Sequence, residues 1–293
     1  MTLLPASLLQ KLGRTRLNPL RAVASTGVGE RRSRALGSGL EFADHRAYEF
    51  GDDTRHLDPH LYARLGRPYI RQYIAGQQLS VTVLIDASAS MAFGSPTKLW
   101  MASALAAGLA YAGLAGGDRV LVGAFSGGRV HWHPRIQGTR AVPALLAWLE
   151  RLRGAGTTDL RREVRASLAR MGSTEGMTFL ISDWFVDGVG DALAALRSAS
   201  QEVVAVQVLA PEELEPERLG EGEVLLLDSE SPNEVEVHLD AGAHARYRLA
   251  LDEWRSELRA SILGRQGRYL AVRSDDDVER VLARDWRLAG LVG

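Results

Sequence analysis

Asp86, Ser88 and Ser90 are the residues whose types and spacing most clearly suggest chemistry in this chain. They follow an apolar alternating run, 79–85, which is typical of a buried strand. Side chains two positions apart in an extended segment point the same way, so one carboxylate and two hydroxyls converge where this strand ends. Open α/β sheets bind their ligands at that end of the strands. Oxygen donors suit magnesium, manganese or calcium better than zinc or copper, so the motif predicts a metal site.

Two later segments are candidates to complete this site. A glycine-rich loop offers the hydroxyls of Thr157 and Thr158, and Asp183 follows the predicted buried strand 177–182. If the sheet is doubly wound, Asp86 and Asp183 share one edge, and we expect Asp183 to be solvent-accessible there. Simpler interpretations exist, because Asp-x-Ser-x-Ser can form a helix cap and a turn, and Asp183 can cap the next helix. Because the Asp86 and Asp183 motifs occur in this order and each lies at a predicted strand end, a shared metal site is favoured over separate caps and turns.

The elements that must position these residues begin near residue 79. From there, apolar strands alternate with amphipathic helices, which predicts a doubly wound α/β sheet with helices on both faces. A Ser-Gly-Gly turn at 126–128 predicts a hairpin, so one edge strand is antiparallel in an otherwise mostly parallel sheet. The predicted strands are 80–85, 119–125, 129–133, 177–182, 202–208 and 268–272, and the predicted helices are 98–114, 140–151, 160–170, 187–198, 242–263 and 276–283.

Composition divides the chain into three regions. Residues 1–40 are basic and interrupted by glycines, which predicts a solvated arm with a short helix near 7–12; a docking arm for an acidic partner is the alternative. Residues 41–78 are dense in arginine and aspartate, which predicts an ion-pair network packed on the main domain, 79–293. Within that domain, the acidic stretch 211–240 predicts a small β insertion with a solvated face, or alternatively an acidic docking surface.

Several classes of function are disfavoured by composition and motifs. The formal net charge of −1 argues against general nucleic-acid binding, and the absence of cysteine excludes thiolate catalysis and disulfides. No P-loop, Gly-x-Ser-x-Gly or His-Glu-x-x-His motif occurs, which argues against nucleotide hydrolysis, serine-hydrolase chemistry and a zinc-protease site. The alanine-rich stretch 99–117 is interpreted as a buried helix, and the N-terminus lacks signal-peptide features. We therefore expect a cytoplasmic protein without membrane insertion.

Together, the strand-end motifs resemble the metal-ion-dependent adhesion site of von Willebrand factor A domains. That family has Asp-x-Ser-x-Ser after its first strand, a threonine in a later loop and an aspartate after a middle strand. The resemblance implies a Rossmann-like fold and a bound Mg2+, or Mn2+ or Ca2+, and assigns as metal ligands Asp86, Ser88, Ser90, Thr158 and Asp183. Thr158 is preferred because Gly-Thr-Asp-Leu is the usual loop form in bacterial members, while Thr157 stays an alternative.

An upstream motif narrows the resemblance to the bacterial domain of unknown function 58. The matching residues are Glu41, Phe42, Arg46, Tyr48, Gly51, Asp52, Asp53, Arg55, Asp58, Ala63 and Arg64. Pro59 departs from the pattern, since the family usually has tryptophan there. Longer members begin with two membrane helices, which this sequence lacks. The resemblance implies operon neighbours that are MoxR-type AAA+ ATPases.

Two hypotheses of function follow. In the first, the chain is a non-enzymatic, metal-dependent protein–protein interaction module, and a carboxylate of another protein completes the coordination of the metal. Such a module would serve as an adaptor for a MoxR-type AAA+ ATPase in protein maturation or assembly. In the second, the metal activates water in a phosphatase-like hydrolase. A missing general base and the absence of Asp-x-Asp after the first strand argue against that chemistry, and a metal-free scaffold is a third alternative.

Overall fold

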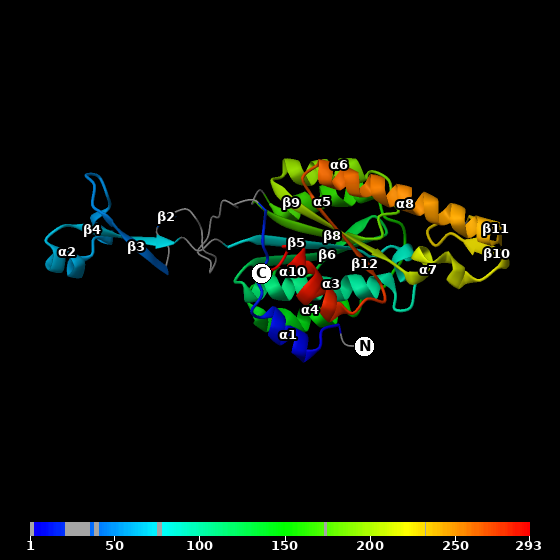
Figure 1. Cartoon of the computed structure of the whole chain (residues 1–293), viewed down its shortest axis with the longest axis horizontal. Helices are drawn as coiled ribbons and strands as arrows, with labels where there is room; N and C mark the ends of the chain where they lie inside the picture. Colours follow the sequence, from blue (N-terminus) through cyan, green and yellow to red (C-terminus); the bar gives the residue numbers. More distant parts are fainter. Residues whose placement is uncertain (1–2, 21–35, 38–40, 75–77, 173–174, 232) are drawn as a thin grey trace. The chain divides into compact units, whose positions relative to one another are not determined.

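The computed structural model describes residues 3–20, 36–37, 41–74, 78–172, 175–231 and 233–293 (Figure 1). The chain divides into two compact units. The larger unit comprises Met1–Arg21 and Ser80–Gly293, and the smaller unit comprises Ala22–Leu79. All of the predicted metal-site residues belong to the larger unit, so its sheet determines how they are placed.

A six-stranded sheet forms the centre of the larger unit, with the strand order β12-β9-β8-β5-β6-β7. All neighbouring strands are parallel except the edge pair β6–β7, which confirms the predicted mostly parallel sheet with one antiparallel edge strand. The strands are β5 (Ser80–Asp86), β6 (Arg119–Ser126), β7 (Arg129–Trp132), β8 (Gly176–Ser182), β9 (Gln201–Leu209) and β12 (Arg268–Arg273). β5 lies between two parallel partners, and its residues 81–86 are all buried.

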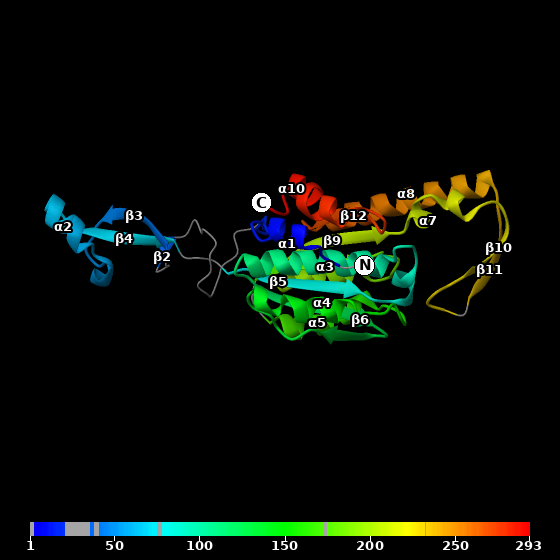
Figure 2. The ribbon, with the colours of Figure 1, turned by 90° about the horizontal axis from the view of Figure 1, so that it is seen from below.

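Helices cover both faces of this sheet, as expected for a doubly wound fold (Figures 1 and 2). One face carries α1 (Ala6–Leu12), α3 (Lys98–Ala115) and α4 (Val142–Leu149). The other carries α5 (Leu160–Met171), α6 (Val189–Ser198) and α8 (Ala241–Gly264). The chain ends in the short helical segments α9 (Val278–Arg280), η5 (Val281–Asp285) and α10 (Trp286–Leu288).

α3 is the most deeply buried of these helices. Thr97 caps its N-terminus by accepting a hydrogen bond from the backbone N–H of Trp100. Within the described part of the chain, α3 alone is long and apolar enough to cross a membrane by length and composition, yet 83% of it is buried. Its contacts with β5, β6 and β9 show the buried core helix that the sequence predicts for the 99–117 stretch.

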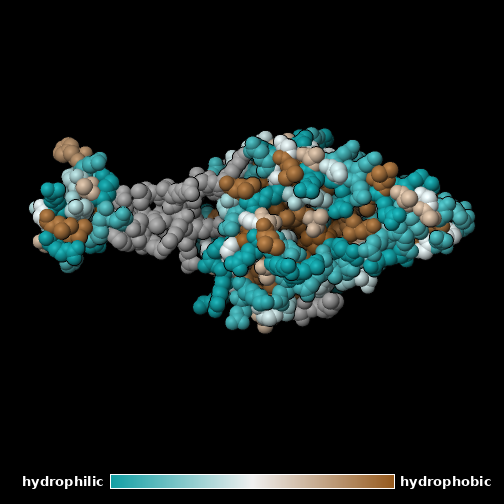
Figure 3. Space-filling model, in the orientation of Figure 1, coloured by the Kyte–Doolittle hydropathy of each residue, from teal (hydrophilic) through white to brown (hydrophobic). Residues whose placement is uncertain are grey.

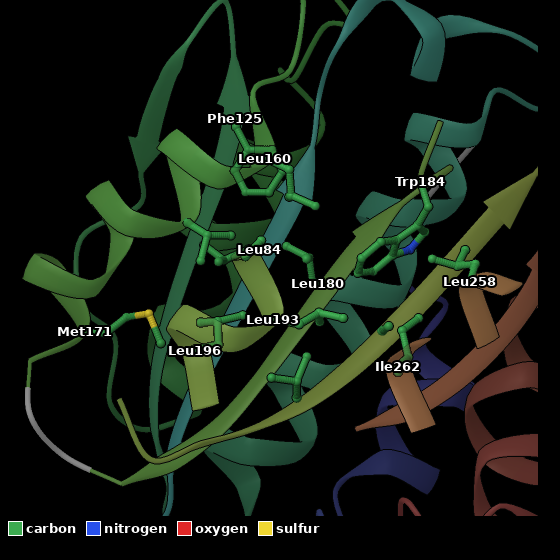
Figure 4. Packing of buried hydrophobic residues seen from close by; sticks show 14 of the residues in the cluster. Leu84, Phe125, Leu160, Met171, Leu180, Trp184, Leu193, Leu196, Leu258 and Ile262 are labelled. Carbon is green, nitrogen blue, oxygen red and sulfur yellow. The ribbon is translucent and has the colours of Figure 1, made fainter. Parts of the chain in front are cut away.

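The main hydrophobic cluster fills the space between the sheet and the helices α5, α6 and α8 (Figure 4). Leu84 and Leu180, from the neighbouring strands β5 and β8, point into the same layer as Leu193 of α6 (Figure 4). Each fully buried side chain of this kind contributes about 1.5–3 kcal/mol. Because Leu84 and Leu180 belong to this cluster, it holds in place β5 and β8, the two strands on which the predicted site depends.

Figure 3 shows hydrophilic side chains over much of the surface, with apolar side chains gathered toward the middle of the larger unit.

The N-terminal segment corrects part of the predicted arm 1–40. Helix α1 forms where it was expected, but Leu8, Leu12 and Leu17 are fully buried, and Leu17 pairs with Val292 near the C-terminus. The basic residues suggested solvation, whereas the regularly spaced leucines require burial. Residues 21–35 and 38–40 lie outside the described part of the chain, so the rest of the arm stays a prediction.

In its described residues, the smaller unit is a three-stranded antiparallel sheet with one α-helix and the short 3-10 helix η1 (Thr54–His56). Its strands are β2 (Leu36–Gly37), β3 (Glu41–Ala47) and β4 (Tyr69–Ile74), in the order β2-β4-β3. The helix α2 (Pro59–Leu65) is capped by Asp58, and proline at its first position suits a helix start. This explains how Pro59 is accommodated where the family usually has tryptophan.

Asp58 is the centre of an ion-pair network in this smaller unit. Its carboxylate accepts hydrogen bonds from Arg71 Nε at 2.8 Å and from His45 Nε2 at 2.9 Å, as well as from two backbone N–H groups of α2. The Arg71 guanidinium, together with His45, holds the pKa of Asp58 well below its usual range. A second pair joins Arg46 to Asp52 at 2.7 Å. The ion pairs predicted from the density of arginine and aspartate are therefore present.

A small β insertion follows the short helix α7 (Pro211–Leu214) and the turn η4 (Pro216–Leu219). Its strands β10 (Gly222–Leu227) and β11 (Glu234–Leu239) form an antiparallel pair, as predicted for the acidic stretch 211–240. The stretch is not solvated throughout, because Pro211 and Pro216 are buried and α7 packs into the larger unit.

Candidate metal centre

The parallel pairing of β5 with β8 brings the two predicted carboxylates to the same edge of the sheet. Ile85 of β5 lies opposite Ile181 of β8, so Asp86 and Asp183 follow at the carboxyl ends of adjacent strands. This is the edge at which open α/β sheets bind ligands.

Asp86 is completely buried at the centre of this edge. Its Oδ1 accepts hydrogen bonds from the backbone N–H of Ser88 at 2.9 Å and from the Thr158 hydroxyl at 2.8 Å. Its Oδ2 accepts a bond from the Ser182 hydroxyl at 2.7 Å. Burial raises the pKa of the Asp86 carboxyl, and the bonds from Ser88 and Ser182 oppose that shift by stabilising the charged form.

The two serines continue the cluster from Asp86 toward Asp183. Ser88 Oγ lies 3.1 Å from Ser90 Oγ, and the Ser90 hydroxyl donates to Asp183 Oδ2 at 2.8 Å. The structure thus joins all five predicted ligands in one hydrogen-bonded cluster drawn from three segments of the chain. Of the two threonine alternatives, Thr158 contacts Asp86, whereas Thr157 is exposed.

Backbone hydrogen bonds fix the loop that supplies Thr158. Ala89 N–H donates to the Gly156 carbonyl at 2.9 Å, and Ala155 N–H donates to the Ala87 carbonyl at 3.0 Å. Gly154 permits this close approach, because a Cβ at that position would lie 2.9 Å from the Ser88 carbonyl oxygen. The loop and the turn after β5 are therefore held together independently of any ligand.

The hydrogen-bonded oxygen pairs have a spacing that is compatible with a hard divalent cation. Magnesium bound at about 2.1 Å in octahedral geometry places adjacent ligand oxygens about 3 Å apart. The oxygen pairs Thr158–Asp86, Ser88–Ser90 and Ser90–Asp183 are separated by 2.8, 3.1 and 2.8 Å. No group of three or more His, Cys, Asp or Glu side chains suited to a metal occurs in the described part of the chain. The donor set of two carboxylates and three hydroxyls therefore suits magnesium, manganese or calcium rather than zinc.

Asp183 corrects the expectation of a solvent-accessible carboxylate, because it is completely buried. Its Oδ1 accepts a hydrogen bond from the Phe185 N–H at 3.2 Å, and its carbonyl accepts one from Gln207 Nε2 at 3.1 Å. It does not cap the next helix, since α6 begins at Val189 after Gly188. The carboxylate contacts Lys98 of α3, which in turn pairs with Glu213 of α7, and sequence patterns place neither residue at this edge.

Lys98 and Glu213 lie at this edge and, like Ser182, were not identified by the sequence analysis. The Lys98 Nζ donates to Asp183 Oδ2 at 2.7 Å and to Glu213 Oε1 at 2.6 Å. Burial raises the pKa of the Glu213 carboxyl, and the nearby Lys98 ammonium opposes this shift. One sequence signal was available for Lys98, which is the single charged residue of the apolar helix 98–115.

Glu163 of α5 is a further buried carboxyl that interacts electrostatically with Asp86. Its side chain is buried, and neither of its oxygens has a hydrogen-bond partner among the described residues. Burial, with repulsion from Asp86 and Asp159, raises the pKa of Glu163 to about 8. It is therefore mainly neutral at pH 7 and adds little charge to the site.

Exposed aromatic side chains border the site. Phe93 and Phe185 are each nearly half exposed, and the Phe185 ring stacks on Trp254 with the centroids 4.4 Å apart. A surface depression of about 460 Å³ lies next to Thr158 and is lined by Phe185, Val186, Asp187, Gly188 and Glu230 among others. The oxygen cluster thus lies beside a surface that combines apolar and acidic side chains with the basic Arg161.

The mostly parallel sheet with its antiparallel edge strand, and the helices on both faces, define a von Willebrand factor A-like fold. The chain belongs to the family described as protein of unknown function DUF58, whose pattern matches residues 44–257. Its similar proteins include uncharacterized proteins of Mycobacterium tuberculosis and Mycobacterium bovis. Each is 29% identical over 255 residues, covering 82% of this chain and 77% of the relative.

Two solved structures are among those to which this chain is similar. The conserved hypothetical protein BatB of Bacteroides thetaiotaomicron is 15% identical, with a TM-score of 0.45, over 72% of this chain and 98% of that one. The SpRpn10 VWA domain is 5% identical, with a TM-score of 0.43, over 71% of this chain and 95% of that one.

Proposed function

We propose that this chain is a non-enzymatic protein–protein interaction module whose binding depends on a divalent cation. The observation that carries the proposal is the cluster of five oxygen-bearing side chains drawn from three segments at the carboxyl edge of the sheet, in which three oxygen pairs are 2.8–3.1 Å apart. Mg2+, Mn2+ or Ca2+ would be held by Asp86, Ser88, Ser90, Thr158 and Asp183. Protein residues alone rarely fill all positions around magnesium, which usually keeps several waters.

A carboxylate of the partner protein would replace one of these waters. Without the cation, that carboxylate would meet the negative charges of Asp86 and Asp183, so binding should require the metal. The exposed rings of Phe93 and Phe185 offer apolar contacts beside the site, and exposed aromatic side chains are frequent anchors of interfaces. The preferred partner segment therefore carries an acidic residue next to an apolar one.

We further propose that the module serves as an adaptor for a MoxR-type AAA+ ATPase in protein maturation or assembly within the cytoplasm. Membership of the DUF58 family supports this role, because the family resemblance implies operon neighbours of that type. The ion-paired segment 41–64 of the smaller unit is the proposed second contact surface.

The decisive experiment is a pull-down from native cells in the presence of Mg2+ or of a chelator. The matched variants are Thr158→Ala, which removes a proposed ligand, and Thr157→Ala, which changes its exposed neighbour. We expect the chelator and Thr158→Ala to abolish capture of the same partners, while Thr157→Ala leaves capture unchanged. Capture that is indifferent to both the chelator and Thr158→Ala would refute the proposal.

A phosphatase-like hydrolase is tested in parallel with a generic phosphate ester and Mg2+ or Mn2+. Turnover by the wild type that disappears in Asp86→Asn would favour the enzyme over the binding module. We expect no turnover above that of the variant.

A further inference from the structure

Lys98 brings a positive charge into the candidate metal centre from the first residue of α3. Its side chain is only 1% exposed, and so is that of Asp183. The ammonium donates to Asp183 Oδ2 at 2.7 Å and to Glu213 Oε1 at 2.6 Å. A buried lysine is stable only when it is paired, and here two carboxylates share the pairing.

The oxygen that accepts from Lys98 is also the oxygen that faces the rest of the cluster. Asp183 Oδ2 accepts the Ser90 hydroxyl at 2.8 Å, and Ser90 in turn contacts Ser88. A divalent cation bound between these serines and Asp183 would therefore lie on the same carboxylate oxygen as the ammonium. Two cations on one oxygen repel each other, and a buried environment screens that repulsion poorly.

We propose that Lys98 is an internal cation that competes with the divalent metal for Asp183, and that Glu213 retains the ammonium when the metal binds. This inference rests on the proposed function, because it assumes that the oxygen cluster binds a metal. Lys98 thereby sets the metal affinity of the site, so that the metal is held weakly enough to respond to a partner's carboxylate.

Glu213 is positioned to receive the ammonium without any large movement. Its Oε2 accepts the Ala210 N–H at 2.7 Å, which fixes the carboxylate at the start of α7. Lys98 already contacts Glu213, so metal binding requires only the loss of its contact with Asp183. The charges then balance, since the metal neutralises Asp86 and Asp183 while Lys98 neutralises Glu213.

Two aromatic rings keep the ammonium in this position. Its Nζ lies 6.0 Å from the centroid of Phe93 and 5.9 Å from that of Phe185, within the range of cation–π attraction. The same two rings are partly exposed beside the site. A partner protein that binds these two rings would therefore also shift the position of the Lys98 ammonium.

The test is a calorimetric titration of the full chain with Mn2+ and with Mg2+. Lys98→Met removes the charge and keeps a long apolar side chain, and we expect it to bind Mn2+ at least about tenfold more tightly than the wild type. Lys11→Met is the matched control, because Lys11 lies on the surface and pairs with Glu279 far from the site in sequence. We expect the control to bind like the wild type.

The outcomes separate this inference from the proposed function. If the wild type binds Mn2+ and Lys98→Met binds equally or more weakly, Lys98 positions Asp183 and the competition is refuted, while the metal-dependent function stands. If neither protein binds a divalent cation at millimolar concentration, both proposals fail. Binding that is detectable only in Lys98→Met would support the competition directly.

A second variant covers the case in which Lys98→Met does not fold. Glu213→Gln removes the alternative partner of the ammonium and leaves Lys98 to Asp183 alone. We expect this variant to bind Mn2+ at least about tenfold more weakly than the wild type, with a correspondingly smaller rise in melting temperature on addition of Mn2+. Unchanged affinity in the folded variant would overturn the proposal.

Discussion

Thr158 and Asp86 are 72 positions apart in the sequence, yet the Thr158 hydroxyl donates to Asp86 Oδ1 at 2.8 Å. This bond connects the loop before α5 to the end of the central strand β5. It also distinguishes the two threonines that sequence analysis could not separate on spacing alone, since Thr157 is exposed.

Thr158→Ala should lower the affinity for Mg2+ about tenfold, because it removes one ligand and releases Asp86 Oδ1 from a hydrogen bond. The loss of that bond should cost about 1 kcal/mol of folding free energy. Calorimetry and urea denaturation measure the two effects, and Thr157→Ala should change neither. Equal effects of the two substitutions would mean that Thr158 has no special role.

Ser182→Ala should destabilise the larger unit by about 1–3 kcal/mol, since the hydroxyl is buried and both donates to Asp86 and accepts from the Trp184 N–H. The exposed Ser198, whose hydroxyl donates to a backbone carbonyl of its own helix, provides the control. Ser198→Ala should stay within about 0.5 kcal/mol of the wild type in urea denaturation. A Ser182→Ala variant as stable as the wild type would show that Asp86 does not need this bond.

Asp183→Ala should destabilise the protein, contrary to what a solvent-accessible carboxylate would predict. The substitution leaves the buried ammonium of Lys98 with Glu213 alone. Removing one partner of a buried ion pair costs about 3–5 kcal/mol, and the remaining carboxylate should reduce this to about 2–3 kcal/mol. In the double variant Lys98→Met/Asp183→Ala, the loss of stability should be smaller than the sum of the single losses. Additive losses, measured by urea denaturation, would contradict the pairing.

Glu163 should make the stability of the protein depend on pH. Its folded pKa of about 8 exceeds its ordinary value of 4.5, so the folded state binds more protons between these values. The contribution of Glu163 to the free energy of unfolding is therefore fully present below its ordinary pKa and is lost as the pH rises toward 8. Glu163→Gln should flatten this decrease, raising the melting temperature more at about pH 8 than at about pH 5. Parallel pH profiles of the two chelator-treated proteins would argue against a buried, uncharged Glu163.

The parts of the site that local patterns encode could be predicted from the sequence. The alternation of strands and helices placed Asp86 and Asp183 at strand ends, and their parallel strands then brought them together. The Lys98–Glu213 pair could not be predicted, because it joins positions 115 apart and depends on where the chain places α7 relative to the first residue of α3. The burial of Asp183 was missed for the same reason. Whether an aspartate after a strand is buried or solvent-exposed depends on segments that are distant in the sequence.

From Ser80 to Ile85, β5 pairs with β6 on one side and with β8 on the other. Strands enclosed in this way exchange their amide hydrogens only when the entire domain opens. We therefore expect the backbone that leads to the aspartate at the tip of β5 to be among the slowest-exchanging parts of the sheet. The position of Asp86 should persist through local fluctuations at the periphery. Deuterium uptake at β5 and loss of the proposed cation binding are therefore expected in the same denaturant range.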